Sequence, residues 1–229
     1  MTSDKDEDAD IPYNMDSPKS PIFLLISQKE FDASSSCYEK PWKGTQKNEE
    51  ALEKLFTELG FVVEKYENQT LVQIRNIFKD VETNEKYKNV SCFVCAILSH
   101  GKDGGFIAGY DKPVQITHLF NDVSKAKHLV GKPKFFIIQA CRGSERMEHI
   151  TRAEAGDDGE QLTLPIHADF LYAYSSPPGF ISFIKSNGGW FIQKLVSIFQ
   201  EKAEKMDVLK MLTRVNFKPA DRRLKSAEG

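Results

Sequence analysis

The sequence predicts an α/β fold in which helices cover both faces of a mostly parallel sheet. Short runs of apolar residues alternate along the chain with longer segments in which apolar residues recur every three or four positions. The short runs are almost continuously apolar, which is typical of strands buried on both faces of a parallel sheet. With 229 residues, of which 40% are hydrophobic, the chain is long enough to enclose a large core.

Seven elements are expected before residue 144. In the helix expected at Asn48–Leu59 the apolar residues follow helical spacing, and Gly60 is a natural stop. Thr70 precedes a second helical pattern and is a candidate N-cap. A third helical pattern places Val130 on its apolar face. The expected strands are Ile22–Ile26, one beginning at Phe61–Val63, Val90–Leu98 and Phe135–Ile138, and the expected helices are Asn48–Leu59, Thr70–Phe78 and Ile116–Val130.

A polar stretch without periodicity divides the chain. So long a structureless segment is uncommon inside a compact domain. After it we expect a strand at Asp169–Tyr174 and helices at Gly189–Met206 and Val208–Val215. The organisation expected from these patterns is a short disordered leader at 1–20, a large half at 21–143, a linker at 144–164 and a small half at 165–229.

Composition and charge exclude several classes of function. The net charge is −2, and no clustered basic excess points to nucleic acid. The first ten residues are acidic, unlike a secretory signal. The longest apolar run, Cys92–Leu98, is far shorter than the ~20 residues that cross a membrane. We therefore expect a cytoplasmic protein that binds neither nucleic acid nor membrane.

Four cysteines are present, and in a reducing compartment we expect free thiols. Cys92 and Cys95 form a C-x-x-C inside an apolar run, with no second pair at zinc spacing. We interpret both as small core residues rather than metal ligands.

Two segments carry residues suited to catalysis. Ser99-His100-Gly101 follows the strand expected at Val90–Leu98, and Cys141 follows the strand expected at Phe135–Ile138. Sites in parallel sheets form at the carboxyl ends of strands, so both segments should emerge at one edge. A free thiol has a pKa of about 8.5, and a nearby imidazole can accept its proton and then protonate a leaving amine.

Residues 139–143 read Gln-Ala-Cys-Arg-Gly, which with a histidine upstream resembles the signature of the caspase family. The resemblance runs from about residue 13 to 216. Further stretches that carry it are 13–15, 43–45, 132–138, 168–175, 189–193 and 212–216.

The resemblance implies a caspase-like three-layer αβα sandwich. It also implies a hydrolase, made as a zymogen, that acts as a thiol protease in apoptosis on protein or peptide substrates. It assigns Cys141 as the nucleophile, His100 as its proton-transfer partner, and the amides of Gly101 and Cys141 as oxyanion donors. It implies no metal and no organic cofactor.

The sequence departs from the family in the specificity pocket. The family holds a substrate aspartate with two arginines and a glutamine, which Gln139 matches, but Trp42 and Ile184 stand in place of the arginines. Lys43 and Lys185 each lie one residue away, and a lysine is a point charge rather than a bidentate fork. We expect cleavage after aspartate to be weakened or lost. The residues expected to line the pocket are Gln139, Trp42, Ser182, Phe183, Ile184 and Trp190.

Two further features leave alternatives open. Asp157 and Asp158 are candidate processing positions in the linker, with an ordinary acidic loop as the alternative. Residues 221–229 are polar where the family continues with a strand, which leaves homodimerisation open. The chain is thus either a caspase-like cysteine endopeptidase or a catalytically impaired pseudo-caspase that acts as a decoy or regulator of an active caspase.

Overall fold

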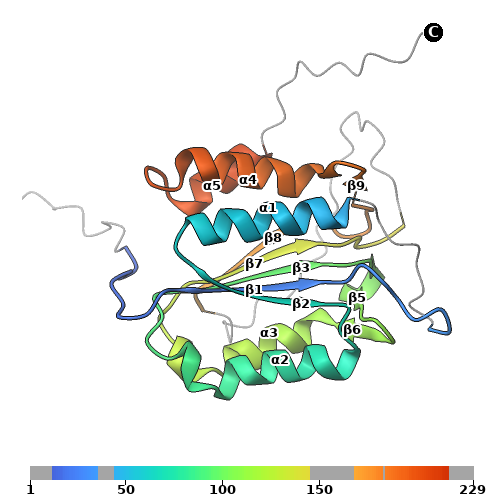
Figure 1. Ribbon diagram of the computed structural model, residues 1–229, viewed down its shortest axis with the longest axis horizontal. Helices are drawn as coiled ribbons and strands as arrows, with labels where there is room; N and C mark the ends of the chain where they lie inside the picture. Colours follow the sequence, from blue (N-terminus) through green and yellow to red (C-terminus); the bar gives the residue numbers. More distant parts are fainter. Residues whose placement is uncertain (1–11, 36–43, 145–167, 183, 217–229) are drawn as a thin grey trace, which may run out of the picture.

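A five-stranded parallel sheet forms the centre of the molecule (Figure 1). The computed structural model describes residues 12–35, 44–144, 168–182 and 184–216. The strand order is β2-β1-β3-β7-β8, and every neighbouring pair in this sheet is parallel. The strands are β1 Ile22–Ser27, β2 Val62–Glu67, β3 Phe93–Leu98, β7 Lys134–Gln139 and β8 Phe170–Tyr174.

Helices cover both faces of this sheet, so the expected three-layer αβα sandwich is confirmed. Figure 1 shows α1, α4 and α5 on one face and α2 and α3 on the other. All six residues of β1, β3 and β7 are buried, because alternate side chains enter two separate apolar clusters. The helices are α1 Thr45–Glu58, α2 Leu71–Thr83, α3 Ile116–Ser124, α4 Trp190–Lys202 and α5 Val208–Asn216.

The predicted end of the third helix, at Val130, was wrong. Helix α3 ends at Ser124, and a 3-10 turn follows at Lys127–Leu129. Ala126 has an extended backbone between them, which breaks the helical register. Val130 is therefore 73% exposed instead of buried. By contrast, Thr70 is the N-cap of α2 as expected, and it forms a capping box with Gln73.

Two small antiparallel units were not expected from the sequence. Strands β4 Gly101–Lys102, β5 Phe106–Ala108 and β6 Pro113–Gln115 form a three-stranded sheet directly after β3. Strands β9 Ile184–Lys185 and β10 Gly188–Gly189 form a hairpin directly before α4. Strands of two or three residues are too short to show a periodic pattern.

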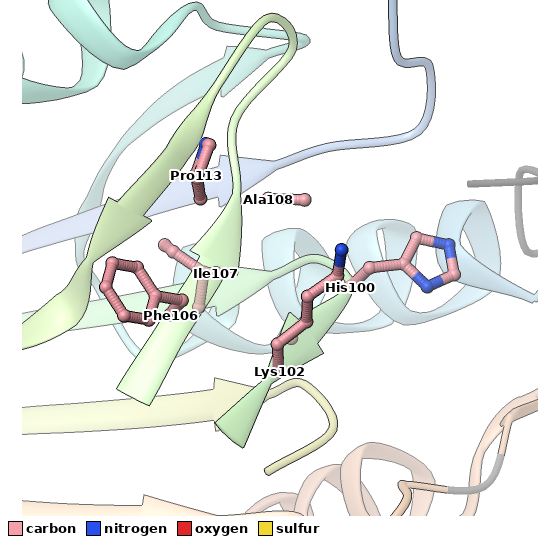
Figure 2. A pocket seen from close by; sticks show the side chains of 7 residues that line it. His100, Lys102, Phe106, Ile107, Ala108 and Pro113 are labelled. Atoms are coloured by element: carbon pink, nitrogen blue, oxygen red, sulfur yellow. The ribbon is translucent and has the colours of Figure 1, made fainter. Parts of the chain in front are cut away.

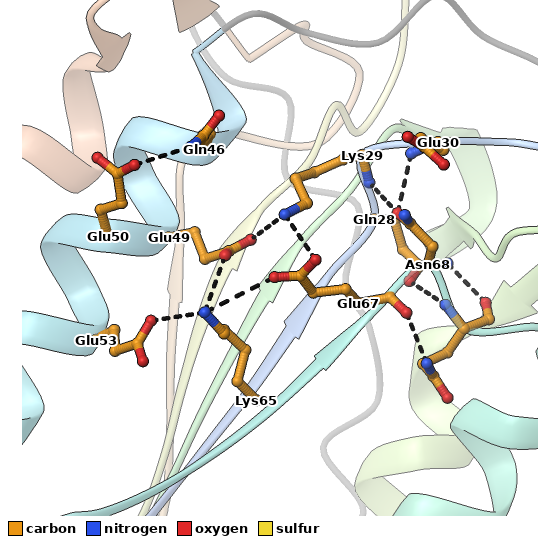
Figure 3. Close-up of polar contacts among 11 residues, drawn as sticks. Gln28, Lys29, Glu30, Gln46, Glu49, Glu50, Glu53, Lys65, Glu67 and Asn68 are labelled. Atoms are coloured by element: carbon orange, nitrogen blue, oxygen red, sulfur yellow. Dashed lines mark hydrogen bonds and ion pairs between the residues drawn. The ribbon is translucent and has the colours of Figure 1, made fainter.

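A network of ion pairs ties the start of α1 to the carboxyl ends of β1 and β2 (Figure 3). The Glu49 side chain is only 5% exposed, and its carboxylate lies 3.2 Å from Lys29 Nζ and 3.3 Å from Lys65 Nζ. Lys29 also contacts Glu67 at 2.8 Å, and Lys65 contacts Glu53 at 2.8 Å. The buried carboxylate is therefore compensated by two cations, as its burial requires.

The Glu67→Gln substitution should lower the free energy of unfolding by an amount that depends on pH. The hydrogen bond from Lys29 holds the pKa of Glu67 below its ordinary value of 4.5. Because the folded-state pKa is the lower one, the carboxylate stabilises the fold above the ordinary pKa, and this stabilisation is lost as pH falls through the folded-state pKa. In urea unfolding of wild type and Glu67→Gln, the difference in unfolding free energy should be constant near neutral pH and shrink toward pH 3. An equal difference at pH 7 and pH 3 would contradict the assignment.

Candidate active site

The two segments singled out from the sequence leave neighbouring strands at the same edge of the sheet. Leu98 at the end of β3 is paired with Gln139 at the end of β7. The backbone N–H of Ser99 continues this pairing and donates to the Gln139 carbonyl at 3.1 Å. The expected shared edge is therefore present, with His100 and Cys141 each two residues beyond the paired strand ends.

The backbone of Gly101 lies directly against that of Cys141. A Cβ atom on Gly101 would lie 2.1 Å from the Cys141 carbonyl oxygen and 3.0 Å from the Ala140 Cβ atom. Real Cβ atoms do not approach a backbone atom so closely. The absence of a side chain at Gly101 thus allows the histidine and cysteine segments to touch.

The small sheet fixes the backbone of His100. The His100 carbonyl accepts a hydrogen bond from the Ala108 N–H at 2.9 Å, and the buried Ser99 hydroxyl donates to the Ala108 carbonyl at 2.7 Å. The imidazole meets the buried Phe31 ring edge-on, with 5.2 Å between ring centroids. These contacts hold the ring at the sheet edge, where Figure 2 shows it directed away from Phe106.

A cavity beside His100 is too small to take a substrate side chain. Its volume is about 10 Å³, which is about the space for one water molecule. Figure 2 shows Phe106, Ile107 and Pro113 on the side of this cavity that lies away from the imidazole ring.

The Cys141 thiol is in contact with the backbone of Ser182. The Ser182 N–H donates to Cys141 Sγ at 3.3 Å, and the Ser182 carbonyl oxygen lies 4.0 Å from the same sulfur. The segment around Ser182 therefore lies directly against the sulfur.

Backbone contacts hold residues 179–182 alongside residues 141–143. The Arg142 N–H donates to the Phe180 carbonyl at 2.9 Å, and the Gly179 N–H donates to the Arg142 carbonyl at 2.8 Å. A Cβ on Gly143 would lie 2.1 Å from the Gly179 carbonyl oxygen. Gly143 therefore allows the backbone of residue 179 to come close, just as Gly101 allows the close contact with Cys141.

Two of the expected pocket residues, Gln139 and Ser182, lie next to Cys141. Gln139 is 1% exposed, and its Nε2 donates to the Ser182 hydroxyl oxygen. The Ser182 hydroxyl in turn donates to Ser175 Oγ at 2.7 Å. Ile184, which the resemblance sets at the place of a family arginine, is half-buried in β9. Trp42, Phe183, Asp157 and Asp158 lie outside the described residues.

Trp190 is the first residue of α4 and is 44% exposed. It lines a hollow of about 360 Å³ together with Arg142 and Tyr174. The Arg142 guanidinium lies over the Tyr174 ring, 4.1 Å from its centroid. Trp190 thus lies at the hollow that Arg142 also lines.

Asn48 is a polar residue at this site that the sequence analysis missed. It is completely buried in the first turn of α1, and its Oδ1 accepts a hydrogen bond from the Gly189 N–H at 2.8 Å. One signal was available, because Asn48 lies four residues before Leu52 and so shares the buried face of the helix.

Cys92 and Cys95 are core residues, as expected. They are 6% and 0% exposed, and neither is in a disulfide. Burial raises the pKa of Cys92 to about 11 and that of Cys95 well above its ordinary value. Among the three described cysteines, Cys141 is the one that is not fully buried.

The described part of the chain offers neither a metal-binding cluster nor a membrane-spanning helix. No group of three or more His, Cys, Asp or Glu side chains there is arranged to hold a metal ion. No helix in the same residues has the length and apolar character needed to span a membrane.

The comparison with known proteins decides the family. The model of the peptidase C14 family, described as the caspase domain, matches residues 21–226. The chain belongs to the caspase family. Its members are cysteine endopeptidases that act on proteins, and the resemblance carried by residues 139–143 is thereby confirmed.

Several vertebrate caspases are similar over most of the chain. Caspase-7 of Gallus gallus is 36% identical, with 90% of this chain and 68% of the relative covered. Caspase-3 of Mesocricetus auratus is 38% identical, with 92% and 76% covered. Caspase-3 of Xenopus laevis is 37% identical, with 89% and 72% covered.

Replacement of Gly101 by alanine should destabilise the fold and lower any activity of the site. The added Cβ would collide with a backbone oxygen, so the two segments have to separate. Overpacking of this kind costs about 2 kcal/mol. The exposed Asp103→Ala, two residues along the same loop, is the matched control and should change stability by less than about 0.5 kcal/mol. Urea unfolding compares the two, and equal stability of both variants would contradict the close contact.

Proposed function

We propose that this chain is a cysteine endopeptidase in which Cys141 is the nucleophile and His100 transfers the proton. The observation that carries the proposal is the backbone contact between Gly101 and Cys141 at the shared edge of β3 and β7. It sets the imidazole and the thiol on adjoining segments, with glycine where backbone N–H groups have to approach an oxyanion. Family membership supports the same roles.

The chemistry proceeds in two steps. The Cys141 thiolate attacks the scissile carbonyl, the carbon–nitrogen bond breaks, and the His100 imidazolium protonates the leaving amine. Water, deprotonated by His100, then attacks the resulting thioester, which releases the acid and restores the thiol. In both steps the N–H groups of Gly101 and Cys141 stabilise the negative oxygen, a contribution worth several kcal/mol in related sites.

The contact between Ser182 and Cys141 supports a zymogen. With the Ser182 N–H on Sγ, a substrate carbonyl reaches the sulfur only after residues 179–182 move. We extend the proposal to activation by cleavage of the linker, for which Asp157 and Asp158 are the candidate positions. Another caspase would be the activating partner, with apoptosis as the process.

Peptide turnover tests the proposal. A positional-scanning peptide library should be cleaved by the wild type after the linker is cut. Cys141→Ala should abolish the cleavage, and His100→Ala should lower it about 10²–10⁴-fold because general acid–base catalysis is lost. His118→Ala is the matched control, since His118 is exposed on α3 and should leave turnover unchanged. Cleavage that survives in Cys141→Ala would refute the assignment of the nucleophile.

A second candidate function is regulation of an active caspase by an impaired relative. The half-buried Ile184 in place of an arginine favours it, together with the contact of Ser182 with the thiol. Thiol alkylation separates the two candidates. If Cys141 is activated, His100→Ala should slow its reaction with iodoacetamide at neutral pH at least tenfold relative to His118→Ala, as peptide mass spectrometry would measure. An unchanged rate would mean that the imidazole does not activate the thiol, and the regulatory function would then be the better account.

A further inference from the structure

Phe31 is a buried aromatic residue that belongs to neither of the two large apolar clusters. It is 8% exposed, and it forms a separate small cluster with Ala108. It lies in the segment that follows β1, where the adjoining residues 29–30 and 32–35 are all at least partly exposed. A phenylalanine that is buried outside the core needs a partner close by to cover its ring.

The partner of the Phe31 ring is the imidazole of His100. The two ring centroids are 5.2 Å apart and the ring planes meet at 63°, which is the edge-to-face arrangement that aromatic pairs prefer. Ala108, the other member of the small cluster, donates its backbone N–H to the His100 carbonyl at 2.9 Å. The main chain of His100 is thus held by Ala108, while Phe31 contacts the ring.

Backbone hydrogen bonds on both sides of Phe31 anchor the segment that carries it. The Gln28 N–H donates to the Leu98 carbonyl at 2.8 Å, and the Asp32 N–H donates to the Tyr110 carbonyl at 2.8 Å. The two acceptors lie on either side of the histidine in the sequence. The phenyl ring and the imidazole are therefore attached to the same stretch of backbone, and their relative position is fixed.

The orientation of a histidine ring has to be set by its surroundings. The last torsion of a histidine side chain has broad energy wells, so the covalent structure alone leaves the ring plane poorly defined. Proton transfer requires the imidazole nitrogen to lie within hydrogen-bond reach of its partner. A misplacement of about 1 Å can lower a rate about 100-fold. A neighbouring aromatic ring restricts the imidazole to the settings in which the two rings pack.

We propose that Phe31 is a positioning residue for the reaction, which holds the His100 imidazole in its orientation toward Cys141 through the contact between the two rings. The inference rests on the proposed protease function. It gives a role to a residue that lies outside the two segments, 99–101 and 139–143, by which the site was recognised.

Alkylation of Cys141 by iodoacetamide tests whether Phe31 acts through His100. Phe31→Leu keeps an apolar side chain but loses the ring, and it should slow the reaction of Cys141 about fivefold. In a His100→Ala background the same substitution should change the rate less than about twofold, because the imidazole that it positions is absent. Phe31→Tyr keeps the ring and should restore the rate to within about twofold of the wild type.

The matched control is Phe199→Leu. Phe199 is 4% exposed and stacks on Phe135 near the start of β7, at the end of the sheet away from His100. This substitution removes a buried ring as Phe31→Leu does, and it should leave the alkylation rate unchanged. An unchanged rate in Phe31→Leu, an equal slowing in Phe199→Leu, or the same slowing by Phe31→Leu in the His100→Ala background would overturn the inference while leaving the roles of Cys141 and His100 in place.

If His100→Ala itself does not slow the alkylation, the protease function fails, and the position of the imidazole is judged by nuclear magnetic resonance. The ring protons of His100, assigned by their loss in His100→Ala, should show nuclear Overhauser contacts with the Phe31 ring in the wild type. They should shift in Phe31→Leu and stay in place in Phe199→Leu. Missing contacts, or signals that Phe31→Leu does not shift, would overturn the inference. The contacts are measured on the wild type, so they decide the question even if Phe31→Leu does not fold.

Discussion

The parallel pairing of β3 with β7 is the interaction on which the site depends. It aligns Leu98 with Gln139, so the segments that follow the two strands start at the same position along the strand direction. The pairing is itself held by burial, since all six residues of both strands are buried and their apolar side chains enter clusters on both faces of the sheet. Because a slip of one residue would exchange the two faces, the register is strongly fixed. The packing of the core therefore determines the position of His100 relative to Cys141.

Beyond the strand ends, contacts between backbone atoms, rather than between side chains, hold the segments together. Gly101 meets the Cys141 carbonyl, and Gly143 meets Gly179, in both cases at a separation that leaves no room for a Cβ. The ion pairs around Glu49 fix the start of α1 to the same edge, and with it Asn48. Cys141, His100 and the buried Asn48 are thus held at one sheet edge by strand pairing, by backbone packing at glycines and by ion pairs.

The long and strongly patterned elements were predictable from the sequence. The continuous apolar runs of β3 and β7 reveal burial on both faces, and the rule that sites gather at carboxyl ends places His100 and Cys141 together. Helix α3 was extended too far because Ala126 and Val130 continue the helical spacing, whereas the backbone leaves the helix after Ser124. Strands β4 to β6 were missed because two or three residues show no period. The contact of Ser182 with Cys141 joins residues 41 positions apart, and no local pattern reports it.

The distribution of the two apolar clusters has a consequence for a chain that is cut between residues 144 and 168. The fully buried residues of one cluster all come from residues 22–140. The other cluster mixes this part with Ala173 of β8 and with residues of α4 and α5, such as Phe191 and Val215. The segment 168–216 also supplies a strand to the main sheet. Two fragments made by such a cut would therefore stay associated by non-covalent complementation, since separating them would expose to water the part of this sheet face that α4 and α5 cover.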